Sequence, residues 1–209
     1  KGKRDLIMLL SLPNMLLMMG IALGDRIAFF IYQPTWVLWA EGVLLDGYDS
    51  AFVQQTVGLI LTLIGAAGIV AQVWLVKPFT RKLGEKRMVI WGTVMRGSAW
   101  MVMAIFPLLI PVVLVAPLIG IGGGIALPAL TALITYTTPL DQQGYAIGLL
   151  HASKSIGRIV GSILGGIIYQ FFSPSATLGA AAAISTFLLI AILSLPTRNR
   201  TAHQEVSVI

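Results

Sequence analysis

Polar and charged side chains line one face of an otherwise apolar segment, residues 144–170. At about 100° per residue in a helix, His151, Ser155, Arg158 and Ser162 share a narrow face, and Lys154 lies about 60° to one side. This cationic stripe could bind an anionic or zwitterionic molecule, and a proton could compete with that molecule for the same groups.

Asp25 is the only acidic residue well inside an apolar segment, and it is our candidate proton carrier. Residue counting at about 1.5 Å per residue makes an Asp25–Arg158 pair across the bundle a reasonable hypothesis. Arg26 is the adjacent alternative partner, although neighbouring side chains on a helix point about 100° apart and seldom pair well. The excess of Arg26, Arg96, Lys154 and Arg158 over Asp25 favours an anionic or zwitterionic substrate over a cationic drug.

These charges also have an interpretation without function. Lys154 could extend its amine to the membrane interface, Asp25 and Arg26 could lie at the outer interface, and Arg96 could pair with a cytoplasmic loop. Charges inside spans cost about 3 kcal/mol each on insertion scales, which favours the functional interpretation.

Other chemistry lacks the residues it needs. The chain has no cysteine, and its two histidines lie far apart, so a metal centre is not expected. The glycine-rich run Gly120-Ile-Gly122-Gly123-Gly124 lacks the Lys-Ser/Thr ending of a phosphate-binding loop, and Gly-x-Ser-x-Gly is absent. We therefore expect a protein that is not an enzyme and that has no cofactor.

The composition places these residues in a membrane. Of 209 residues, 57% are hydrophobic and 11% charged, and the mean hydropathy is +0.90, more apolar surface than a water-soluble shell can hide. The apolar runs exceed the ~10-residue strands of membrane barrels and do not alternate. We predict an all-α integral membrane protein, a single bundle over residues 1–209 whose six transmembrane helices approximate 8–37, 52–76, 88–106, 111–136, 144–170 and 176–195.

The distribution of basic residues predicts the orientation. With six crossings, one side receives Lys1, Lys3, Arg4, Lys77, Arg81, Lys82, Lys86, Arg87, Arg198 and Arg200. The positive-inside rule then puts both termini, the basic loop 77–87 and the tail 197–209 in the cytoplasm, in a plasma (inner) membrane, and nucleic acid is not expected as a partner. A break at Asp25-Arg26 would make two short spans and send the basic loop outside, so we favour one long first helix.

Two motifs resemble the major facilitator superfamily, and specifically the carboxyl-terminal six-helix half of its drug and proton antiporters, which include tetracycline exporters. The loop reads Lys77-Pro-Phe-Thr-Arg81-Lys82-Leu-Gly84-Glu-Lys86-Arg87, similar at Gly84, Lys86 and Arg87 to the family's Gly-x-x-x-Asp-Arg-x-Gly-x-Lys-Arg. The fifth segment, Ser155-Ile-Gly157-Arg158-Ile-Val-Gly161-Ser162-Ile-Leu-Gly165-Gly166, is similar to the antiporter signature, with Ser162 where proline is usual.

The resemblance implies one half of a twelve-helix fold and a cytoplasmic gating loop that includes Arg81, Lys82, Gly84, Lys86 and Arg87. We expect a fragment, a truncated gene product or one partner of a two-half assembly, and the start at Lys1 favours a fragment. The implied partners are the lipid bilayer, a small-molecule substrate and a second six-helix half.

The glycines Gly157, Gly161, Gly165 and Gly166 predict close packing of the fifth helix, with a hinge as the alternative role. The resulting hypothesis is secondary active transport by alternating access, in which a six-helix half takes part in proton-coupled export of drugs or organic ions. The alternative is a non-transporting assembly or regulatory module derived from a transporter half. An intramembrane enzyme would need a nucleophile and a base near one membrane face, and no such cluster is evident.

Overall fold

The structure is a computed structural model that describes residues 14–195, and within that range all regular structure is helical. The elements follow one another as α2 (Met15–Tyr32), a 3-10 turn (Gln33–Thr35), α3 (Trp36–Trp39), a π turn (Ala40–Leu44), α4 (Ser50–Val70), a second π turn (Ala71–Leu75), α5 (Val76–Leu83), α6 (Glu85–Ile105), α7 (Leu109–Thr137), a 3-10 turn (Leu140–Gln142), α8 (Gln143–Phe171) and α9 (Ala176–Leu193).

Local chemistry accounts for several helix ends. The side chain of Asp49 accepts a hydrogen bond of 3.0 Å from the Ala51 amide and caps α4. Pro34 lacks an amide hydrogen, and the chain tightens into a 3-10 turn at that point before the helix resumes. Gly84 has a φ of 79°, a conformation that favours glycine, and it reverses the chain between α5 and α6.

Within residues 14–195, five stretches are long and apolar enough to cross a membrane: Met15–Leu44, Ser50–Leu83, Glu85–Ile105, Leu109–Thr137 and Ala176–Leu193. The remaining predicted span, 144–170, forms α8, which at about 1.5 Å per residue exceeds the ~30 Å hydrocarbon core. Its histidine, lysine, arginine and serine side chains interrupt the apolar run. Asp25 and Arg26 lie inside the continuous helix α2, so the break considered at this dipeptide does not occur.

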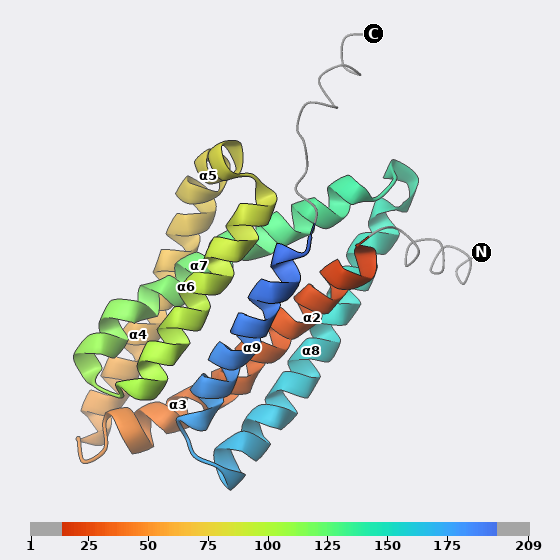
Figure 1. Cartoon of the computed structure of the whole chain (residues 1–209). Helices are drawn as coiled ribbons and strands as arrows, with labels where there is room; N and C mark the ends of the chain where they lie inside the picture. Colours follow the sequence, from red (N-terminus) through yellow and green to blue (C-terminus); the bar gives the residue numbers. More distant parts are fainter. Residues whose placement is uncertain (1–13, 196–209) are drawn as a thin grey trace.

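The helices form one bundle in which α9 contacts both α2 and α6 (Figure 1). On one side α7 packs against α6 and α4 packs against α7, whereas on the other side α8 packs against α2. The helices α4 and α8 therefore lie at opposite edges of the bundle (Figure 1).

The buried interior has two apolar clusters separated along the helices. One contains Met15, Met18 and Met88, toward the end that carries the α5–α6 turn, and the other contains Trp36, Trp39 and Trp100, toward the opposite end. The interval between them holds a polar layer, which we define as Asp25 on α2, Thr93 and Arg96 on α6, and Ser185 on α9, all of them buried.

Glycines bring α8 against α2. A Cβ on Gly157 would lie 2.6 Å from the Leu23 carbonyl oxygen, a Cβ on Gly161 would lie 2.7 Å from that of Ile27, and a Cβ on Gly165 would overlap that of Ile31. Gly166 has nothing within 4 Å of the corresponding position, so it takes no part in this contact, although its neighbour does. Backbone contact of this kind suits a lipid environment, where packing drives helix association.

We expect Gly165→Ala to destabilise the bundle by about 1–3 kcal/mol, because the added methyl group forces α8 away from α2. Thermal unfolding of the detergent-solubilised chain measures the effect. Gly166→Ala is the matched control, since it adds the same methyl group one residue away in open space. Equal unfolding temperatures for the two variants would contradict the proposed contact.

Candidate functional site

A buried ion pair joins α2 to α6 at the polar layer. The Nη2 atom of Arg96 donates a hydrogen bond to Oδ1 of Asp25, and these residues are only 2% and 5% exposed. The Nη2 atom of Arg26 lies 3.4 Å from the second carboxylate oxygen, Oδ2. Opposite charges with shared hydrogen bonds reduce the cost of burial, which for a lone charge is several kcal/mol.

Two small residues make room for this pair. A Cβ on Gly24, beside Asp25, would lie 2.8 Å from Leu188 of α9, and a Cβ on Gly97, beside Arg96, would lie 3.0 Å from Cβ of Ser185 of α9. Because α9 fits closely against both helices, the Arg96 guanidinium can reach from α6 to the carboxylate on α2.

The pairing of Asp25 with Arg158 expected from the sequence is wrong. Asp25 pairs with Arg96 and Arg26, whereas the guanidinium carbon of Arg158 lies over the Phe30 ring, 5.1 Å from its centroid. Residue counting gave the depth of each group but not the direction that each helix turns toward its neighbours. The alternative placements of Arg96 against the basic loop and of Asp25 at the outer interface are also wrong, because both residues are buried in the polar layer.

Three cations gather where α2 meets α8. The cationic cluster, defined as Arg26, Lys154 and Arg158, lies around Gly157, whose Cβ position is 2.8 Å from Cβ of Arg26. Lys154 is half-buried and Arg158 is exposed, and both the Arg158–Arg26 and Arg26–Lys154 pairs lie close enough to repel. The Nε atom of Arg26 is buried without a hydrogen-bond partner.

The rest of the predicted stripe stays on the outer face of α8. His151 and Ser155 are exposed and Ser162 is half-buried. No group of three or more His, Cys, Asp or Glu side chains within residues 14–195 is arranged to hold a metal ion.

The predicted gating loop consists of α5, the turn at Gly84 and the start of α6. Arg81, Lys82 and Arg87 are exposed, whereas Lys86 turns inward. Its Nζ donates a hydrogen bond of 2.8 Å to the Leu193 carbonyl and another to that of Leu195. Lys86 therefore satisfies carbonyls at the end of α9, where a cation also complements the helix dipole.

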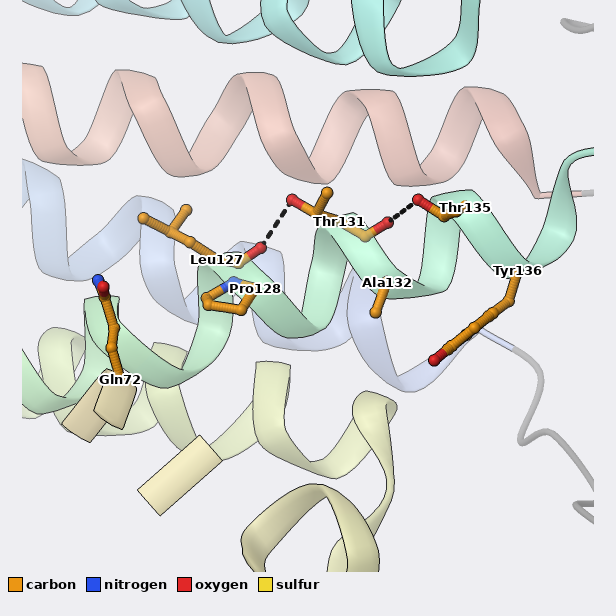
Figure 2. Close-up of a pocket in the computed structure, with 7 residues that line it drawn as sticks. All are labelled: Gln72, Leu127, Pro128, Thr131, Ala132, Thr135 and Tyr136. Atoms are coloured by element: carbon orange, nitrogen blue, oxygen red, sulfur yellow. Dashed lines mark hydrogen bonds between the residues drawn. The ribbon is translucent and has the colours of Figure 1, made fainter. Parts of the chain in front are cut away.

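A pocket that sequence reasoning missed lies between the second π turn and the carboxyl-terminal half of α7 (Figure 2). Its volume is about 520 Å³, and its lining consists of Gln72, Leu127, Pro128, Thr131, Ala132, Thr135 and Tyr136. The hydroxyl groups of Thr131 and Thr135 donate to the carbonyls of Leu127 and Thr131, both at 2.9 Å (Figure 2). Pro128, a proline inside an apolar helix, is a sequence signal that could have drawn attention to this part of α7.

Removal of the Arg96 charge tests the buried pair. We expect Arg96→Met to destabilise the chain by about 3–5 kcal/mol, because Asp25 is then left buried with only the more distant Arg26. Thermal unfolding in detergent measures the effect, and adding Asp25→Asn should restore part of the loss. Arg158→Met is the control and should shift stability by at most about 0.5 kcal/mol, since Arg158 is exposed. Similar losses of stability in Arg96→Met and Arg158→Met would show that the Asp25–Arg96 pair contributes no more to stability than an exposed arginine does.

Replacement of Lys86 tests its role at the end of α9. We expect Lys86→Met to cost about 1–2 kcal/mol, because two carbonyls lose a charged donor. Hydrogen exchange at the last turn of α9 should rise in this variant and stay unchanged in the exposed control Lys82→Met. Unchanged exchange in both would contradict the capping role.

The chain is similar in sequence to a known protein family and to several named proteins. The sequence profile of the Major Facilitator Superfamily matches residues 15–208. The class B tetracycline resistance protein of Escherichia coli is 32% identical over 69% of this chain and 34% of its own length. The class G tetracycline resistance protein of Vibrio anguillarum is 28% identical over 73% of this chain and 37% of its own length.

A third relative, multidrug resistance protein 2 of Bacillus subtilis (strain 168), is 29% identical over 61% of this chain and 32% of its own length. The chain thus spans about a third of the length of the curated relatives that it matches. The all-α membrane fold and the resemblance to drug antiporters expected from the sequence are confirmed. The chain is an integral membrane protein and belongs to the major facilitator superfamily.

Proposed function

We propose that this chain is one half of a secondary active transporter, which exports drugs or organic ions from the cell in exchange for protons by alternating access. The observation that carries the proposal is the set of charges at mid-depth in membrane-length helices: Asp25, Arg26, Arg96, Lys154 and Arg158. Each such charge is costly in hydrocarbon, so a bundle that keeps five of them needs a polar pathway beside them. The names of the relatives, tetracycline and multidrug resistance proteins, support export as the direction.

A second six-helix half is part of the proposal, and its docking surface consists of the edge helices α4 and α8. Gly58 and Gly65 on α4 and Gly144, Gly148 and Gly166 on α8 have nothing within 4 Å of their Cβ positions. Small residues let another helix approach closely in lipid. Coverage of only about a third of each relative's length supports the same arrangement.

In this proposal Asp25 carries the coupling proton. Protonation would neutralise the carboxylate that holds Arg96, so the link between α2 and α6 would weaken at the polar layer. The cationic cluster and His151 line the substrate pathway. Both termini and the basic loop 77–87 face the cytoplasm of a cell whose plasma membrane holds the protein, and Lys86 anchors that gating loop to the end of α9.

Proteoliposomes test the function. The chain is reconstituted alone and together with the amino-terminal six-helix half of the E. coli class B relative, and uptake of tetracycline and 2-naphthoate is followed with and without a pH gradient. We expect proton-driven accumulation only with both halves present. Asp25→Asn should lose accumulation driven by the gradient and keep exchange of labelled for unlabelled substrate, because exchange needs no net proton movement. Glu41→Gln, which removes an exposed charge outside the gating loop and the cationic cluster, is the control and should behave as the unchanged chain.

Two outcomes would contradict the proposal. If the halves associate, as shown by cross-linking through α4 and α8, but move neither compound under either condition, the non-transporting assembly becomes the better description. If Asp25→Asn accumulates substrate as well as the unchanged chain does, Asp25 is not the proton carrier.

A further inference from the structure

The middle parts of the helices carry more positive than negative charge. Away from the helix ends, the helices within residues 14–195 contain Arg26, Arg96, Lys154 and Arg158 but only one carboxylate, Asp25. That carboxylate is occupied, because Arg96 binds Oδ1 and Arg26 approaches Oδ2. Lys154 and Arg158 therefore have no carboxylate within ion-pair distance in this part of the chain.

The cationic cluster is compact and open to one side. Gly157 sits against Arg26, Lys154 precedes it by about one helical turn and Arg158 follows it directly, so all three side chains leave from one contact between α2 and α8. Arg158 is exposed and Lys154 is half-buried, which leaves donors that a ligand can reach. Three cations that repel one another in hydrocarbon surroundings are stabilised most by an anion placed between them.

Two aromatic rings lie beside the cationic cluster, and the guanidinium groups of Arg26 and Arg158 lie over the faces of these rings. The guanidinium carbon of Arg26 lies 5.8 Å from the Phe29 ring centroid, and that of Arg158 lies 5.1 Å from the Phe30 ring centroid. The two rings contact each other edge to face, with centroids 5.4 Å apart. A guanidinium stacked on a ring keeps its edge donors available, and the rings add an apolar surface beside them.

We propose that Arg26, Lys154 and Arg158 form a binding site for an organic anion that has one carboxylate or sulfonate and an aromatic or apolar body. The anionic group binds among the three cations, and the body rests on Phe29 and Phe30. Cationic drugs are disfavoured at this site because the cluster repels them. The inference deepens the proposed function by naming the substrate class, and it depends on that function for its physiological meaning.

The test uses the full chain in nanodiscs of phosphatidylcholine, a lipid without net charge, and three probes that share a naphthalene ring. Equilibrium dialysis measures binding of labelled 2-naphthoate, its uncharged amide and the corresponding trimethylammonium cation. We expect that, of the three probes, only 2-naphthoate binds saturably. Arg158→Gln and Lys154→Gln should each weaken it about tenfold or more, as expected for loss of one charged hydrogen bond. Arg158→Lys should restore part of the affinity, and Lys77→Gln should leave it unchanged.

Several results would overturn the inference. Equal binding of naphthoate and amide would assign the affinity to the rings alone, and unchanged binding in both glutamine variants would place the anion elsewhere. Displacement of naphthoate by phosphatidylglycerol in the nanodisc would make a lipid headgroup the occupant. If adding the second half abolishes naphthoate binding, and Arg158→Gln separates the halves, an acidic side chain of that half is the natural counter-ion.

The two proposals fail in different ways. Proton-driven transport of an uncharged or cationic compound, without naphthoate binding, would refute the anion site and leave the transporter intact. Saturable naphthoate binding that depends on Arg158, without transport by the assembled halves, would refute the transporter and leave the anion site.

Discussion

The contact between Asp25 and Arg96 constrains the middle of this bundle, because neither charge can be left alone in hydrocarbon. The pair requires α2 and α6 to stay within reach of one arginine side chain although α9 packs against both. Glycines on each side of that helix allow the approach, and the two apolar clusters close off the pair above and below. Burial of charge thus joins α2 to α6 through two residues that lie 71 positions apart in the sequence, while α9 packs against both helices.

The charged residues in the middle of the bundle form two groups with different roles. Asp25 and Arg96 neutralise each other inside the protein, whereas Lys154 and Arg158 face outward from an edge helix. Arg26 belongs to both groups, since it approaches the carboxylate and also repels the two cations on α8. A change in the charge of Asp25 would therefore alter the electrostatic environment of Lys154 and Arg158, and the reverse also holds. Arg26 in this way connects the buried contact between α2 and α6 to the exposed side of α8.

Sequence reasoning predicted the helical membrane fold and the placement of Asp25 and Arg26 within one helix, because apolar length and the positions of basic residues carry that information. It named Arg26 as an alternative partner of Asp25, and this contact is present, but it did not predict Arg96 as a partner. Periodicity gives the face of one helix but not its rotation relative to another, and the close contacts of Gly24 and Gly97 with α9 are not visible in the residue spacing. The role of Lys86 was hidden for the same reason, since its acceptors lie more than a hundred residues away. The pocket at Gln72 depends on a π turn, which apolar sequence does not reveal.

Each of the two π turns changes the direction in which the side chains after it face along a continuous span. A π turn takes one residue more than the α-helix would, and one residue is about 100° of rotation. The turn at Ala71–Leu75 therefore rotates the helix that follows it, so that the basic residues of α5 are oriented independently of the exposed side of α4. The turn at Ala40–Leu44 does the same for the acidic end of the first span. Each of these two spans thus changes the direction in which its side chains face part of the way along, and the loss of a single residue there would redirect one end of the span while leaving its length, its composition and its hydropathy almost unchanged.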